Sequence, residues 1–157
     1  MVHWTLRKWG GVINLIMPNC SDFINENSNY IKQTTIDDIT FKIECVKAIN
    51  NNTYGLFKDN KVTNGLTYIF EFDCVMKNDN TVLRALFGGG KGSPGVWNEY
   101  GRMDNVTVGH HTFEIDLTEF NSDAFTGIIR TYFGLYNPPT GSYAIVSNVK
   151  FYQKEVS

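Results

Sequence analysis

A glycine-rich segment followed by aromatic and polar residues carries the side chains best suited to binding a sugar. Residues 88–95 lead directly to Trp97 and Tyr100. A pyranose presents apolar C–H faces, which pack on flat rings, and hydroxyls, which bond planar polar groups. We expect both rings to stack on a sugar; the alternative is that Trp97 folds back to close one end of the core. The expected partners of the sugar hydroxyls are Asn98, Glu99 and Arg102.

A second candidate surface lies on one side of the strand that we expect over residues 126–136. Alternate side chains of a strand point to opposite faces. The apolar residues at every second position from 129 to 135 would face the core, and Arg130, Tyr132 and Tyr136 would share the other face. That face is either a platform for a sugar or a solvated or subunit-facing surface without a ligand.

Three carboxylates at short spacing raise the possibility of hydrolysis. The segment 114–119, Glu-Ile-Asp-Leu-Thr-Glu, resembles the ExDxxE pattern of family 16 glycoside hydrolases, which are jelly-roll enzymes. The resemblance implies Glu114 as nucleophile, Asp116 as its supporting group and Glu119 as general acid, which matches the paired carboxylates that retention requires. Those enzymes are much longer than this chain, however, and an outward E-x-D pair also keeps the outer face of a strand wet.

The histidines and cysteines do not indicate a metal site or a disulfide framework. His110 and His111 are adjacent, so on a strand they point to opposite faces and at most one could join a site. Three widely spaced cysteines fit neither a full disulfide framework nor a CxxC site. We expect Cys45 and Cys74, in apolar strands, to be buried thiols, while Cys20 is uninformative. No cofactor is expected.

Composition restricts the class of protein. A length of 157 residues with 42% hydrophobic residues fits one globular domain. The net charge of −2 provides no broad positive field, so nucleic-acid binding is not expected. No run approaches the roughly 20 apolar residues of a membrane helix, so membrane insertion is not expected. The apolar run 12–17 is too short for a signal peptide, and either Met1 or Met17 could be the natural start.

Alternation with a period of two predicts an all-β chain. The clearest strand covers residues 66–76, with Tyr68, Phe70, Phe72, Cys74 and Met76 toward the core. Turn signals separate further runs, and Asn137-Pro-Pro-Thr-Gly141 must be a turn because proline cannot donate to a sheet ladder. Strands are also expected within 36–49, 53–57, 81–87, 111–117 and 142–153.

Together these runs predict one antiparallel β-sandwich or jelly roll of about eight strands over residues 13–157. Residues 1–12 are expected to form a flexible N-terminal segment. A long functional or mobile loop is expected over residues 88–101, and a short helical turn is expected at 118–125.

Three short segments resemble carbohydrate-binding-module-like sandwiches, including those appended to bacteriophage tail and baseplate proteins and to glycoside hydrolases. They are the opening N-L-I at 14–16 with Asn19 and S-D-F at 21–23, the central Y-I-F-E-F-D at 68–73, and the closing I-V-S-N-V-K-F-Y at 145–152. Many such modules have an aspartate before the valine of the last strand. Asn148 stands there in this chain and is a weaker oxygen ligand, so structural calcium is unsupported.

The resemblance and the candidate residues favour a non-catalytic carbohydrate-binding module. It would be extracellular or part of a phage virion, in a tail or baseplate that contacts host surface glycan, without a recognisable signal peptide. The alternative is a structural virion module, a capsid decoration or tail adaptor, whose partners are other virion proteins. The third hypothesis is the family 16-like hydrolase that uses Glu114 and Glu119.

Overall fold

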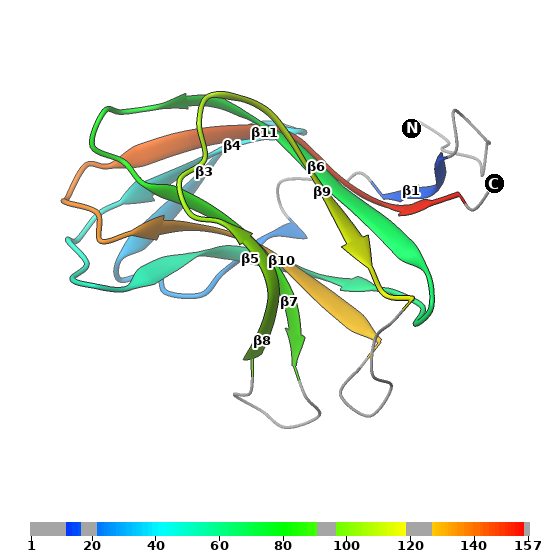
Figure 1. Cartoon of the computed structure of the whole chain (residues 1–157). Coiled ribbons are helices and arrows are strands. Elements are labelled where there is room, and N and C mark those ends of the chain that lie inside the picture. Colours follow the sequence, from blue (N-terminus) through cyan, green and yellow to red (C-terminus); the bar gives the residue numbers. More distant parts are fainter. Residues whose placement is uncertain (1–11, 17–21, 91–96, 119–126, 156–157) are drawn as a thin grey trace.

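The chain folds into two antiparallel sheets packed face to face, as a computed structural model of residues 12–16, 22–90, 97–118 and 127–155 describes it (Figure 1). Sheet A has the order β3-β4-β11-β6-β9, and β1 pairs with β11. Sheet B has the order β2-β5-β10-β7-β8. The strands of sheet A are β1 (Val12–Ile16), β3 (Ile31–Asp37), β4 (Thr40–Cys45), β6 (Thr67–Lys77), β9 (Gly109–Asp116) and β11 (Tyr143–Lys154). Those of sheet B are β2 (Ile24–Asn25), β5 (Thr53–Lys61), β7 (Leu83–Gly90), β8 (Trp97–Met103) and β10 (Ile128–Tyr136).

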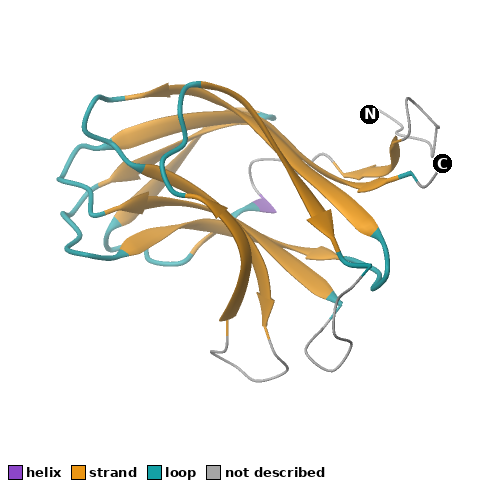
Figure 2. Cartoon of the chain, viewed as in Figure 1, coloured by secondary structure: helices purple, strands orange, loops and turns teal. Residues whose placement is uncertain are grey.

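The predicted all-β sandwich is confirmed, and strands joined by short loops dominate the described chain (Figure 2). The described residues form eleven strands, more than the expected number of about eight. Seven of them match the predicted runs, whereas β1, β2 and β3 were not predicted as strands and β8 was taken for part of a loop. The outward side of β3 and its turn are polar, so this edge strand shows little apolar alternation. Within the part of the chain described here, no helix is long and apolar enough to cross a membrane.

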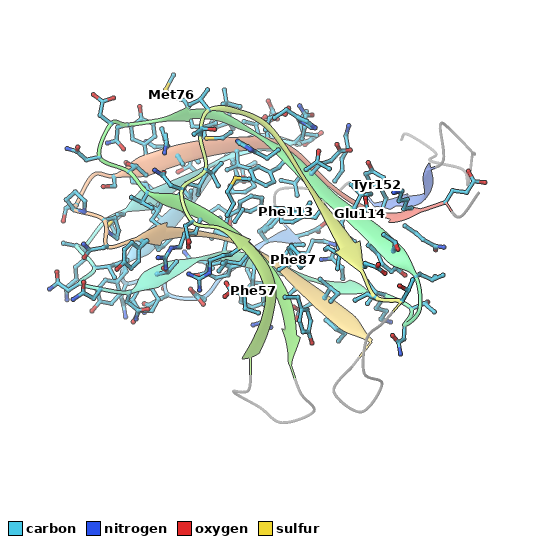
Figure 3. The ribbon with its side chains drawn as sticks, viewed as in Figure 1. Phe57, Met76, Phe87, Phe113, Glu114 and Tyr152 are labelled. Atoms are coloured by element: carbon cyan, nitrogen blue, oxygen red, sulfur yellow. The ribbon has the colours of Figure 1, made fainter. Side chains whose placement is uncertain are left out.

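One aromatic core joins the two sheets. Phe133 of β10 packs on Phe70 and Phe72 of β6, with ring centroids 5.6 and 4.8 Å apart. Phe70 also stacks on Phe113 of β9 at 5.8 Å. Figure 3 shows Phe87 and Phe113 between the sheets, with centroids 5.4 Å apart. The alternation in the sequence therefore identifies the inward residues of β6, β9 and β10 correctly, with one exception.

Met76 is the exception, because it was predicted to face the core and is 48% exposed. The register between β6 and β11 shifts at this point: Met76 pairs with Ile145, and Cys74 pairs with Val146. The extra residue, Val75, is a β-bulge, and a bulge reverses the side to which the following side chains point. In Figure 3, Met76 projects away from the rest of the molecule.

The prediction of a long loop over residues 88–101 is also wrong. β7 continues to Gly90 and β8 begins at Trp97, so paired strands cover most of that segment. Consecutive glycines usually indicate a turn because they have no side chain to pack. Here close packing explains one of them: a Cβ at Gly89 would lie 2.9 Å from the carbonyl oxygen of Ile128.

Two predictions fall on residues that are not described. The helical turn expected at 118–125 lies, apart from Thr118, outside the described residues. The flexible segment expected at 1–12 also lies outside them, except that Val12 begins β1.

Candidate functional site

The outward side chains of β5, β10, β7 and β8 form one surface, which we call the sheet B face. In β10 the residues 129, 131, 133 and 135 are buried in the core, as predicted. Arg130, Tyr132 and Tyr136 consequently share the opposite side of the strand. The strand register places Asp59 beside Arg130 and Phe57 beside Tyr132. On the other side of Tyr132 follow Leu86 of β7 and then Arg102 of β8.

A ring, a guanidinium group and a carboxylate stack at one end of this face. Nε and Nη2 of Arg130 donate to the two carboxylate oxygens of Asp59 at 2.7 and 3.0 Å. The Arg130 guanidinium lies over the ring of Phe57, with its carbon 3.7 Å from the ring centroid. Hydrogen bonding to Asp59 raises the pKa of Arg130. We call Phe57, Asp59 and Arg130 the Phe57 stack; Figure 3 shows where Phe57 lies on sheet B.

A second stack of the same kind lies further along the face. The guanidinium carbon of Arg84 is 3.8 Å from the ring centroid of Tyr136. Nη1 of Arg84 donates to the hydroxyl of Thr53 at 3.0 Å, and Nε lies 3.6 Å from a carboxylate oxygen of Asp104. Tyr136 was predicted as a site residue, whereas Arg84 and Phe57 were not. Arg84 and Phe57 could be identified only from the strand register, which a single sequence does not reveal.

Tyr132, between the two stacks, is built into the sheet. It is 6% exposed, and its hydroxyl donates to the Glu26 carboxylate. Burial, followed by the bond to Glu26, raises the pKa of Tyr132. A Cβ at Gly134 would overlap the Tyr132 ring and Thr53, so glycine leaves the space in which this ring lies. The predicted role of Tyr132 as a ligand-contacting ring does not fit this burial. The Tyr132 ring instead packs within the sheet beneath the exposed side chains of the face.

The candidate residues of the β7–β8 hairpin point to two different sides of sheet B. Arg102 extends onto the sheet B face and donates to Glu99 at 2.8 and 2.9 Å and to Asp104 at 3.0 Å. These hydrogen bonds, to Glu99 first, raise the pKa of Arg102. Tyr100 instead packs against the core, and burial raises its pKa. Its predicted stacking on a sugar therefore does not fit its position.

The backbones of Trp97 and Asn98 pair with Gly90 and Gly89. Their side chains lie outside what the structure describes, so the predicted roles of both residues stay predictions. The pairing of Gly88 with Glu99 and Arg130 extends the row of Asp59 across the sheet.

Charge on the sheet B face is compensated locally. Each of the three arginines contacts a carboxylate: Arg130 contacts Asp59, Arg102 contacts Glu99 and Asp104, and Arg84 approaches Asp104. The paired carboxylates and guanidinium groups still offer acceptors and donors at their rims. Such a surface can exchange hydrogen bonds with hydroxyls, and its three described arginines already have carboxylate partners.

The carboxylates that resembled a hydrolase motif lie on the other sheet. Glu114 accepts two bonds from Lys154, at 3.1 and 3.2 Å, on the exposed side of β9. Asp116 accepts from the hydroxyl and backbone N–H of Thr118, and these bonds lower the pKa of Asp116. Glu119 lies outside the described residues. The outward direction of both described carboxylates is confirmed.

The histidines and cysteines also take the predicted positions. His110 and His111 point to opposite faces: His110 faces Asp73 and Glu71, and Nε2 of His111 lies 2.7 Å from the carbonyl oxygen of Thr107. Cys45 and Cys74 are buried free thiols, and burial raises the pKa of each. Cys20 lies outside the described residues.

Asn148 has a left-handed backbone (φ 52°) and donates to Asp73 at 2.9 Å. Among the described residues, no group of three or more His, Cys, Asp or Glu side chains is placed to hold a metal ion.

Solved structures with this fold include sugar-binding modules, a phage protein and an enzyme. TmCBM61 in complex with β-1,4-galactotriose matches with a TM-score of 0.55 and 13% identity over 87% of this chain and 91% of that chain. Other carbohydrate-binding modules also match. Tailspike protein 4 of bacteriophage CBA120 matches with a TM-score of 0.56 and 12% identity over 86% of this chain and 20% of that chain.

A Stig cyclase, Fisc from Fischerella sp. TAU, matches with a TM-score of 0.60 and 10% identity over 91% of this chain and 89% of that chain. No family model matches the chain, and no curated protein sequence does. At these identities the similarity concerns the fold. The chain has the β-sandwich fold of carbohydrate-binding modules.

Proposed function

We propose that the chain is a non-catalytic carbohydrate-binding module and that its sheet B face binds a neutral glycan. The observation that carries the proposal is the Phe57 stack, in which an aromatic ring, a guanidinium plane and a carboxylate lie within hydrogen-bonding or stacking distance on an outward face. Flat surfaces accept the C–H faces of a pyranose, and the groups at their rims bond its hydroxyls.

The position of the second stack supports a ligand longer than one sugar. Tyr136 and Arg84 lie on the same face as the Phe57 stack, with the buried ring of Tyr132 between them. A chain of sugar units can contact both stacks at once. Trp97 and Asn98 stay predicted contacts at the β7–β8 end of this surface.

Local charge compensation supports a neutral ligand. A uronic-acid or sialylated chain would bring negative charge to arginines that already have carboxylate partners, so little would be gained. The similarity to TmCBM61, whose solved complex holds a neutral galactotriose, agrees with this choice.

Titration calorimetry and affinity electrophoresis test the proposal with neutral polysaccharides (β-1,4-galactan, xylan, mixed-linkage β-glucan) and an acidic one (polygalacturonate). We expect saturable binding to at least one neutral polysaccharide. Binding should be about tenfold weaker after Phe57→Ala, because the ring holds the Arg130 guanidinium plane in place on the face. Tyr143→Ala is the matched control, because that ring lies under Lys42 on the outer side of sheet A. Absence of saturable binding to any neutral polysaccharide would contradict the proposal.

We further propose that the module is extracellular or part of a phage virion, where the glycan is on the host surface. The phage tailspike domain with this fold supports that setting. The same observation favours the second candidate function, a structural virion module such as a capsid decoration or tail adaptor. Light scattering separates the two: a glycan-binding monomer keeps its mass as concentration rises, whereas a structural module self-associates.

A further inference from the structure

The outer side of sheet A carries a histidine clamped between two carboxylates. His110 lies on edge strand β9, directly beside Asp73 of the neighbouring strand β6. Its Nδ1 lies 2.6 Å from a carboxylate oxygen of Asp73, and its Nε2 lies 3.1 Å from a carboxylate oxygen of Glu71. One ring therefore bridges two residues of the neighbouring strand.

A doubly protonated ring satisfies both contacts at once. A neutral imidazole has one N–H, so one of its nitrogens would turn a lone pair toward a carboxylate oxygen. The imidazolium has two N–H donors and satisfies both contacts. The hydrogen bond to Asp73 accordingly raises the pKa of His110, with a smaller contribution from Glu71.

The groups around the ring favour the charged form of Asp73. Burial acts to raise the pKa of Asp73, but hydrogen bonds from Asn148 and His110 and the charge of Lys150 outweigh it, and the pKa of Asp73 is lowered. From β11, Tyr152 bonds Glu71; burial and then this bond raise the pKa of Tyr152 to about 12. On β9 itself, the Thr112 hydroxyl lies 3.4 Å from Nε2 of His110, and the next acidic residue, Glu114, is paired with Lys154.

We propose that His110 is a pH-sensitive latch that ties edge strand β9 to β6. β9 lies at the edge of sheet A, so a bridge to its neighbour limits local opening of the strand. The latch works on sheet A, and it stands independently of glycan binding on sheet B.

The pH window follows from the directions of the two shifts. Because the pKa of His110 is raised in the folded chain, the stabilisation is complete below the ordinary histidine value of 6.5 and is lost as pH rises through the raised value. Because the pKa of Asp73 is lowered, its contribution is complete above the ordinary value of 3.8 and is lost as pH falls through the lowered value. The latch is therefore closed in mildly acidic solution and opens as the pH rises through the raised pKa of His110.

Amide hydrogen exchange of the full chain tests the latch, together with an NMR titration of the histidine rings. After correction for intrinsic chemical exchange, we expect β9 amides to exchange about twofold to fivefold faster as the latch opens, the range expected for an exposed ion pair. We expect the ring of His110 to titrate above 6.5 and Asp73→Asn to lower its midpoint.

His110→Gln removes the titrating group and should make the corrected exchange of β9 fast and independent of pH. His111→Gln is the control on the opposite side of the same strand and should keep the wild-type profile. The latch is refuted if wild type and His110→Gln share one pH profile, or if His110 titrates at or below its ordinary value.

Discussion

The two outward faces of this sandwich share one core and carry different chemistry. The sheet B face holds aromatic rings covered by guanidinium groups, and Gly134 makes room for the ring of Tyr132. The outer side of sheet A holds a network of carboxylate, imidazole and carboxamide groups around His110. The fold supplies two similar outward faces. The residues at alternate positions give one of them rings stacked with guanidinium groups and the other a histidine between two carboxylates.

The largest effect in this comparison should come from the shared core. Phe133 of sheet B packs on rings of sheet A, including Phe41 and Phe72, at centroid distances of 5.9 and 4.8 Å. We expect Phe133→Ala to lower the free energy of unfolding by about 3–5 kcal/mol, because it leaves a cavity between the sheets. Urea denaturation measures the loss. Glycan affinity should fall, and the pKa of His110 should be raised less than in the wild type. Retention of wild-type stability would show that the sheets do not share this core.

Overpacking at Gly134 should affect the sheet B face and leave the His110 site on sheet A unchanged. A Cβ there overlaps the ring of Tyr132 and the methyl group of Thr53, so Gly134→Ala must displace the ring under the two stacks. We expect a loss of about 1–3 kcal/mol in unfolding free energy and weaker glycan binding, with the His110 titration preserved. Equal damage to both faces would contradict their independence. Thr34→Ser, at an exposed position of edge strand β3 in sheet A, is a neutral control.

The sequence predicted the architecture well because it depends on a repeated physical signal. Alternation identified the inward residues of β9 and β10 and the outward direction of Arg130 and Tyr136. It failed at Met76, where one extra residue reverses the pattern, and at the glycine end of β7, residues 88–90, where hydrogen bonding without side chains leaves no pattern. Local spacing cannot reveal either event.

The candidate site was predictable only in part, because it depends on which strands are neighbours. Arg130 and Tyr136 were named from one strand, but their partners Phe57 and Arg84 come from β5 and β7. The clamp of His110 likewise joins β9 to β6, so a pair of adjacent histidines gave no sign of it. Tyr132 alternates correctly and still lies buried, since exposure depends on what covers a residue.

Salt concentration should affect the two faces differently, with smaller changes than those expected for the substitutions above. Because the arginines of the sheet B face are compensated, glycan affinity should change less than about twofold between 0.05 and 0.5 M NaCl. The stabilisation from His110 is an exposed ion pair and should weaken over the same range. Calorimetry and thermal unfolding at each salt concentration measure the two responses. A steep fall in glycan affinity with salt would indicate an ionic ligand.

The smallest effect should follow from Glu114→Gln. Glu114 is bound to Lys154 on sheet A and has no role in the proposed glycan surface. We expect unchanged glycan affinity and a change in unfolding free energy below about 1 kcal/mol. Reducing-sugar release from β-glucan should be absent in both proteins. Hydrolysis by wild type that Glu114→Gln abolishes would restore the hydrolase hypothesis.

The most direct test of the central claim is to map a bound neutral oligosaccharide by NMR chemical-shift perturbation of the full chain. We predict perturbations centred on Phe57, Arg130 and Tyr136 and extending along β5, β10, β7 and β8, with the outward residues of sheet A unchanged. Perturbations centred on His110 and β11, with the Phe57 stack unaffected, would contradict the assignment of the glycan to sheet B.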